Sequence, residues 1–300
     1  MHNLAQLTTE GINPATVDID MRSAAEIVAL INAEDRSVAE AVQRELSSIA
    51  AAVDLIAARL ARGGRLIYVG AGTSGRLAAI DAAECGPTYS AGPDQVTAIL
   101  AGGERAMLHA SEGAEDDAAT GAAEIAALGV GPDDAVVGVA ASGRTPFVLG
   151  ALEEARRRGA ATVGVVNNAA TPIEAAVDVG IAVVTGPEVV SGSTRMKAGT
   201  AQKMVLNMLT TATFIKLGKV YGNLMVDVVA GNAKLRDRAR RILTRATGAD
   251  DARAGAALAA ADGNVKVALV SLLADVDAAE AARRLAAANG YVRRAVQPPA

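Results

Sequence analysis

The segment IYVGAGTSGRL, residues 67–77, joins a short apolar run to a glycine-rich turn. Its glycines Gly70, Gly72 and Gly75 match the G-x-G-x-x-G template, in which the turn after a strand opens a helix and binds a dinucleotide. The N–H groups and the partial positive charge at a helix N-terminus attract anions. The segment therefore predicts a strand, a turn and a helix around an anion site, and the ligand of this site is either a dinucleotide or a smaller phosphate.

The sequence after this turn predicts a parallel sheet. Apolar runs at 65–70, 95–100, 135–140, 161–166 and 181–185 alternate with helical patterns near 75–85, 114–128, 145–158 and 171–177. Strands that are apolar almost throughout, each followed by a helix, are typical of a sheet covered on both faces. We therefore expect an α/β fold built on a five-stranded, parallel, doubly wound sheet.

The N-terminal part of the chain is predicted to be mostly helical. Apolar periodicity runs over residues 27–60, with an interruption near Glu34-Asp35. Gly63-Gly64 closes this run, because glycine is common just past the end of a helix. Residues 1–62 are therefore expected to form an N-terminal helical segment.

Two further helical parts follow the predicted sheet. A long apolar-rich helix is expected over residues 194–217, with Ser193 as its N-cap and Gly218 past its end. The alanine-rich tail is broken at 263–264 and again at 289–290, which predicts a small three-helix unit. After the N-terminal segment, we therefore expect an α/β domain with long following helices (63–246) and a helical C-terminal unit (247–300).

Composition excludes several classes of protein. One cysteine, Cys85, and two histidines, His2 and His109, argue against disulfides and against a cysteine- or histidine-based metal site. A net charge of −4 without a lysine-rich block, together with the absence of tryptophan, argues against a nucleic-acid surface. The sequence shows neither an apolar run of about 18 residues nor a secretory signal. We therefore expect a cytoplasmic protein without metal, nucleic-acid or membrane partners.

Two more hydroxyl-rich turns favour a sugar phosphate over a dinucleotide. ASGRTP (141–146) follows the third predicted strand, and SGSTRMK (191–197) follows the fifth. Loops after the strands of an open parallel sheet gather at one edge, so hydroxyl, N–H and basic groups of all three turns are expected to line one pocket. The acid that binds a dinucleotide ribose is expected about 20 residues past the glycines, where Gly102-Gly103 precedes Glu104. Each turn taken alone is equally well explained as an ordinary turn or helix cap.

Two glutamates are expected at opposite ends of helices, one at a C-terminus and one at an N-terminus. Glu84 is expected to close the helix that begins at the glycine turn, because Gly86-Pro87 should end it. The negative end of the helix dipole penalises an ionised carboxylate there, as suits a general acid. Glu115 is expected at the start of the next helix, where the dipole favours the ionised form that a general base needs. The alternative is an exposed surface acid for Glu84 and simple dipole compensation for Glu115.

Six longer segments of the chain can be compared with known families: VGAGTSGRLAAIDAAECGPTY, AGGERAMLHASEGAEDD, VVGVAASGRTPFVLGAL and GPEVVSGSTRMKAGTAQKMVLNML, together with LTTEGINPATVDID and YGNLMVDV. They resemble the N-acetylmuramic acid 6-phosphate etherase family, whose members have the sugar isomerase (SIS) fold. The resemblance spans residues 4–245, and the tail looks like the small helical unit of the family. One departure is Gly86-Pro87-Thr88-Tyr89, where the family usually has Pro-Pro-Thr-Phe.

The resemblance implies cleavage of the D-lactyl ether of N-acetylmuramic acid 6-phosphate, by elimination and then addition of water, without a metal or an organic cofactor. By motif match, Glu84 is the proton donor and Glu115 the second catalytic acid/base residue. The candidate sugar and phosphate contacts are Thr73, Ser74, Ser142, Thr145, Ser193, Thr194 and Lys197. The resemblance also implies a homodimer, and a role in the catabolism or recycling of cell-wall amino sugars.

Three alternatives stay open at this point. The first is a non-catalytic sugar-phosphate sensor on the same fold, which would bind the phosphate without needing both Glu84 and Glu115. The second is an aldose–ketose isomerase, which needs a base but no acid for an ether oxygen. The third, a dinucleotide-dependent oxidoreductase, rests on the glycine template alone.

Overall fold

The computed structural model describes residues 7–109, 113–228 and 233–297. The chain divides into two compact units, Met1–Ala83 with Pro93–Thr210 and Glu84–Gly92 with Thr211–Ala300. Helices α3 (Gly72–Tyr89) and α7 (Lys197–Lys216) contribute residues to both units. The division into three parts at residues 62 and 246 stays a prediction, and His2 lies outside the described residues. Among the helices that the structure describes, none is long and apolar enough to cross a membrane.

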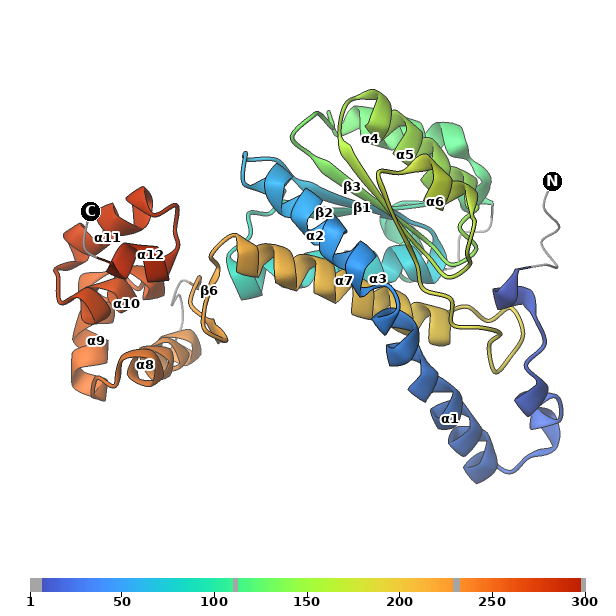
Figure 1. Cartoon of the computed structure of the whole chain (residues 1–300), viewed down its shortest axis with the longest axis horizontal. Helices are drawn as coiled ribbons and strands as arrows, with labels where there is room; N and C mark the ends of the chain where they lie inside the picture. The colour runs from blue at the N-terminus through green and yellow to red at the C-terminus, as the bar shows by residue number, and fades with distance from the viewer. Residues whose placement is uncertain (1–6, 110–112, 229–232, 298–300) are drawn as a thin grey trace. The chain divides into compact units, whose positions relative to one another are not determined.

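A five-stranded parallel sheet lies at the centre of the first unit (Figure 1). Its strands are β1 (Leu66–Gly70), β2 (Val96–Leu100), β3 (Ala135–Ala140), β4 (Ala161–Val166) and β5 (Val179–Ala182). They pair in the order β2-β1-β3-β4-β5, and every pairing is parallel. The predicted sheet is therefore confirmed, although β5 begins at Val179 rather than at Ile181, because it pairs with β4 from that residue onward.

Helices cover both faces of this sheet, as Figure 1 shows. One face carries α4 (Ala118–Ala127), α5 (Pro146–Arg157) and α6 (Pro172–Ala176), and the other carries α2 (Leu46–Leu60) with the first parts of α3 and α7. Successive side chains of a strand point to opposite faces. Ile67 and Val69 therefore pack in the core cluster with Phe147 and Leu152 of α5, whereas the hydroxyl of Tyr68 donates a hydrogen bond to Asp81 of α3.

The N-terminal helices break at a different point from the one predicted. α1 runs over Ala24–Gln43 and α2 begins at Leu46, so the break lies after α1 and the predicted interruption at Glu34-Asp35 is wrong. Polar residues are tolerated in the middle of α1 because this helix buries only Val38, Ala41 and Val42 and exposes most of its surface. From residue 7 onward, three short 3-10 turns precede it, Thr8–Glu10, Pro14–Thr16 and Ile19–Met21.

Helix α3 continues through the Gly86-Pro87 pair that was predicted to end it. The helix runs to Tyr89 with Pro87 inside its last turn. Proline at this place deprives only the carbonyl of Ala83 of its helical donor, and Gly86 has no Cβ atom to collide with the proline ring. Glu84 therefore lies in the body of the helix. The helix dipole acts on it less than predicted, since this effect fades beyond the last turn.

Helix α7 begins later than predicted and is capped by a residue that is distant from its start. Ser193 lies ahead of the helix, so its predicted role as N-cap is wrong. The carboxylate of Glu188, which is fully buried, accepts hydrogen bonds from the backbone N–H groups of Lys197 and Ala198, both at 2.9 Å. At the other end of α7, Gly218 has a φ of +74°, as a residue past a helix end requires.

The second unit is mainly helical. It contains α8 (Ala233–Thr247), α9 (Asp251–Ala260), α10 (Val265–Ala274), α11 (Ala278–Ala287), α12 (Val292–Val296) and a hairpin of β6 (Val220–Tyr221) and β7 (Leu224–Met225). The predicted unit had three helices separated by two breaks. In their places lie α9, then α10 and α11 where one helix was expected, and then the short α12. The breaks at 263–264 and 289–290 are confirmed. A further break after Ala274, where Asp275 adopts a φ of 52°, was not predicted.

Candidate active site

The three hydroxyl-rich turns of the first unit meet at a pocket of about 290 Å³. These turns follow β1, β3 and β5, whose carboxyl ends lie at one edge of the parallel sheet. The pocket is lined by Thr9, Glu10, Ala71, Gly72, Thr73, Ser74, Glu115, Val139, Ala140, Ala141, Ser142, Thr145 and Thr194. The structure thus brings together Glu115 and most of the hydroxyl side chains that the sequence predicted as sugar and phosphate contacts.

Two glycines let β1 and α3 approach closely enough to form the first wall of the pocket. A Cβ atom on Gly70 would lie 2.7 Å from the backbone nitrogen of Gly75, and one on Gly75 would lie 2.7 Å from the carbonyl oxygen of Gly70. Neither position therefore accepts a side chain without moving the backbone. The tight turn puts Thr73 and Ser74 in the first turn of α3, where the backbone N–H groups have no helical partner.

The second wall comes from the turn between β3 and α5. Gly143 has a φ of +66°, and a Cβ atom there would lie 2.4 Å from the Cβ atom of Thr171. Ser142 accepts a hydrogen bond from the backbone N–H of Arg144 at 3.3 Å. Thr145 precedes α5, but its side chain makes no capping hydrogen bond. Thr145 is therefore the N-cap residue of α5 by position, but its hydroxyl is not used for capping, and Thr145 lines the pocket.

Glu115 lies at the pocket in a short 3-10 turn, Ala114–Asp116, rather than in the helix that follows. The cap of α4 is Asp117, whose carboxylate accepts hydrogen bonds from the hydroxyl of Thr120 at 2.6 Å and from its backbone N–H at 2.9 Å. These bonds hold the pKa of Asp117 below its ordinary value. Compensation of the helix dipole is thus provided by Asp117 and not by Glu115.

Three of the predicted site residues are not among those that line this pocket. Glu84 belongs to the second unit. Ser193 is half-buried in the turn ahead of α7. Lys197 is buried, and its ammonium group lies 2.6 Å from the carboxylate of Glu34. The hydrogen bond from Lys197 holds the pKa of Glu34 below its ordinary value, against the effect of burial.

The charge of the lining differs from the one expected. Within the described part of the chain, the charged side chains of the pocket are the carboxylates of Glu10 and Glu115, and no lysine or arginine lines it. The expectation that basic groups of the turns line the pocket is therefore wrong. Arg144 and Lys197 belong to these turns, but the ammonium group of Lys197 pairs with the carboxylate of Glu34. An anion in this pocket would be held by hydroxyls and by backbone N–H groups.

A further wall comes from the N-terminal segment, which the sequence did not assign to the site. Thr9 and Glu10 line the pocket. Asn168, which is buried after β4, accepts a hydrogen bond from the hydroxyl of Thr8 at 2.9 Å and donates to the hydroxyl of Thr9 at 3.0 Å. Its amide also donates to the carbonyl oxygen of Ala141, next to Ser142. The one available signal was that Thr8, Thr9 and Glu10 belong to a segment that resembles the family.

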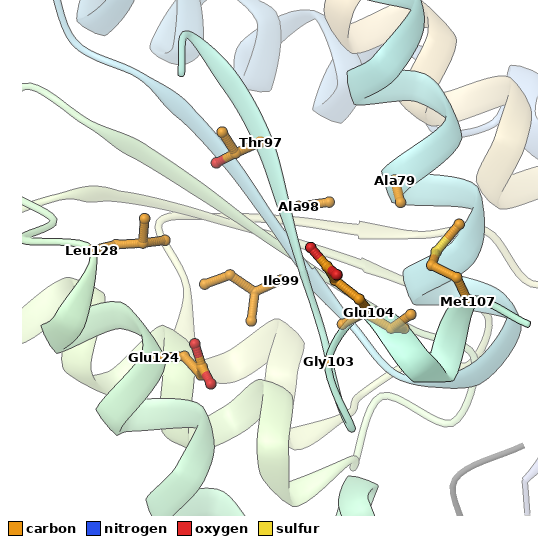
Figure 2. Close-up of a pocket in the computed structure, with 10 residues that line it drawn as sticks. Ala79, Thr97, Ala98, Ile99, Gly103, Glu104, Met107, Glu124 and Leu128 are labelled. Carbon is orange, nitrogen blue, oxygen red and sulfur yellow. The ribbon is translucent and has the colours of Figure 1, made fainter. Parts of the chain in front are cut away.

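A second pocket of the first unit, of about 440 Å³, lies beside the edge strand β2 (Figure 2). Its lining is mainly apolar and includes Ile99 and Leu128. Figure 2 shows that Glu124 comes from α4 and Glu104 from the turn after β2. None of the site residues predicted from the sequence lines this pocket, although all of them are described.

Comparison with known proteins agrees with this fold. Residues 48–156 match the glucokinase regulatory protein N-terminal SIS domain, and residues 118–212 match the SIS domain. A phosphoheptose isomerase from Francisella tularensis has the same fold, with a TM-score of 0.50 at 18% identity over 65% of this chain and 100% of that one. The fold and the domain matches therefore define a SIS-domain protein.

Within this class, the chain belongs to the N-acetylmuramic acid 6-phosphate etherase family. It is 59% identical to the etherase of that name from Symbiobacterium thermophilum over 91% of each chain. It is 54% identical to the one from Mycolicibacterium smegmatis, over 98% of this chain and 99% of that relative. The etherase from Streptomyces avermitilis is 54% identical over 98% of this chain and 94% of its own length.

Proposed function

We propose that this chain cleaves the D-lactyl ether of N-acetylmuramic acid 6-phosphate and releases N-acetylglucosamine 6-phosphate and D-lactate. The observation that carries this proposal is the 54–59% identity, over nearly the whole chain, to proteins named for this activity. The pocket supports it, because a lining rich in hydroxyls at a helix N-terminus suits a phosphorylated sugar. The relatives do not favour the alternative of a non-catalytic sensor.

The chemistry needs two groups that exchange protons. In the ring-opened sugar, the aldehyde acidifies the proton on the adjacent carbon, and the carboxylate of Glu115 removes it. The bond from the next carbon to the lactyl oxygen then breaks, and Glu84 gives a proton to the departing oxygen. D-lactate leaves behind an unsaturated aldehyde. Water adds to its double bond with the proton transfers reversed, which restores both glutamates.

We assign the hydroxyls of Thr73, Ser74, Ser142, Thr145 and Thr194 to sugar and phosphate contacts, since all of them line the pocket. The phosphate is best placed at the first turn of α3, where backbone N–H groups and two hydroxyls coincide. Ser193 and Lys197 stay in the proposal as neighbours of Thr194. A contact from Lys197 would require its ammonium group to leave Glu34.

The test is to incubate the protein with N-acetylmuramic acid 6-phosphate and to measure D-lactate. We expect Glu84→Ala and Glu115→Ala each to abolish release of lactate while the fold and binding of the product persist. Asp116→Ala is the matched control, because this exposed acid is adjacent to Glu115 but does not line the pocket. No lactate from folded protein that still binds sugar phosphates would refute the etherase and favour the sensor.

We further propose a homodimer, supported by the N-terminal segment. Ile12, Val17, Met21 and Val28 are 62–78% exposed, and the first half of α1 buries no residue. Large apolar side chains exposed along one segment suit an interaction surface if they lie together. Val28→Lys should shift the sedimentation coefficient to that of a monomer, and an unchanged dimer would refute this surface. The expected place of action is the cytoplasm, in catabolism or recycling of cell-wall amino sugars.

A further inference from the structure

The carboxylate of Glu10 is the feature of the pocket that neither the chemistry nor the phosphate contacts explain. Glu10 ends the 3-10 turn Thr8–Glu10 and lines the pocket with Glu115. Apart from its neighbour Thr9, the other lining residues lie far from it in the sequence, so only tertiary contacts bring it there. An acidic side chain beside an anion site repels the anion. The described residues offer Glu10 neither an ion pair nor a hydrogen bond to its carboxylate.

The segment that carries Glu10 is held in place by two groups of hydrogen bonds. On one side, Asn168 links the hydroxyls of Thr8 and Thr9 to the backbone of Ala141, and Thr9 is 1% exposed. On the other side, the hydroxyl of Ser191 donates to the carbonyl oxygens of Glu10 at 3.2 Å and of Gly11 at 3.1 Å. The backbone of Glu10 is therefore fixed against the turns that carry Ser142 and Thr194.

The carboxylate of Glu10 lies next to the turn at Gly192. A Cβ atom on Gly192 would lie 3.4 Å from Oε2 of Glu10, so the carboxylate lies above this glycine, next to the turn that leads to Thr194. An ionised carboxylate only accepts hydrogen bonds. It can therefore bind a hydroxyl or an amide N–H of a sugar, but it repels a phosphate.

We propose that Glu10 determines the specificity of this site, because its carboxylate accepts a hydrogen bond from a hydroxyl or acetamido N–H of the sugar and disfavours a bare phosphate. This inference rests on the proposed function in one respect, namely that the pocket binds a phosphorylated sugar. It makes Glu10 a substrate contact that acts separately from the proton transfers of Glu84 and Glu115. The N-terminal segment then serves recognition as well as the fold.

The test compares the binding of two probes by calorimetry, inorganic phosphate and N-acetylglucosamine 6-phosphate, neither of which requires turnover. Loss of a hydrogen bond to a charged group weakens binding by about tenfold or more. Glu10→Ala should therefore raise the Kd of the sugar phosphate by about tenfold or more, while phosphate binds equally well or more tightly. Glu10→Gln keeps an acceptor but not the charge. Its Kd for the sugar phosphate should therefore lie between those of the wild-type chain and of Glu10→Ala. Glu104→Gln is the matched control, because it removes a carboxylate from the other pocket.

The outcomes separate this inference from the proposed reaction. Unchanged Kd values in Glu10→Ala, or equal weakening of both probes, would overturn the role of Glu10 even if the wild-type chain releases D-lactate. A selective loss of sugar-phosphate binding in a chain that releases no lactate would support Glu10 and refute the etherase. Thermal unfolding of each variant shows whether the fold is intact.

Discussion

Replacing Glu188 by alanine removes the cap of α7 and tests how this helix is placed at the pocket. Glu188 is 0% exposed and accepts hydrogen bonds from the backbone N–H groups of Lys197 and Ala198, both at 2.9 Å. Each buried donor left without a partner costs about 1–3 kcal/mol, and loss of a negative charge at a helix N-terminus costs up to about 2 kcal/mol more. We expect Glu188→Ala to lower the free energy of unfolding by about 3–5 kcal/mol, a large part of the roughly 5–15 kcal/mol that stabilises a domain.

The assay is urea unfolding followed by far-ultraviolet circular dichroism. Glu188→Gln keeps one acceptor oxygen for one of the two N–H groups, so it should cost about half as much. Asp117→Ala removes an exposed cap of α4 in the same unit and should lower the free energy of unfolding by much less. The reasoning is refuted if Glu188→Ala costs no more than Asp117→Ala, since the two N–H groups would then have found other acceptors.

Three further predictions follow from contacts of the first unit. Burial raises the pKa of Asp134, but hydrogen bonds from Arg65 and the backbone outweigh it and hold this pKa below the ordinary value of 3.8. The stability that Asp134 provides is therefore present above pH 3.8 and is lost as the pH falls through the lower pKa of the folded state. In Asp134→Asn, the urea midpoint should therefore decrease less steeply as the pH is lowered. Gly75→Ala, whose Cβ atom would lie 2.7 Å from the carbonyl oxygen of Gly70, should lower the urea midpoint of the first unit, whereas Gly131→Ala, in open space, should not. Asn168→Ala should speed proteolysis of the N-terminal segment and lower the free energy of unfolding by about 2 kcal/mol. An unchanged rate of cleavage would show that the hydrogen bonds of Asn168 do not hold this segment.

Much of the fold could be predicted from local patterns. The five strands follow from apolar runs. The central strands β1, β3 and β4 are buried along their whole length, so they have no polar side to interrupt the run. The three turns at the pocket follow from glycine and hydroxyl residues at strand ends, since the carboxyl ends of parallel strands share an edge. Helix ends were predicted less well. Pro87 lies inside α3 because its cost is small in a last turn, where one carbonyl loses its donor.

The sequence by itself determined the sheet, the glycine turn, the family resemblance and the two candidate catalytic glutamates. Each of these depends on periodicity, backbone freedom or motifs within one short segment. Only the tertiary structure decided that Glu10 lines the pocket, that Glu188 rather than Ser193 caps α7, and that Lys197 pairs with Glu34. The physical reason is that polar side chains are paired by distance in space. Their partners lie on other segments of the chain, where no local pattern reveals them.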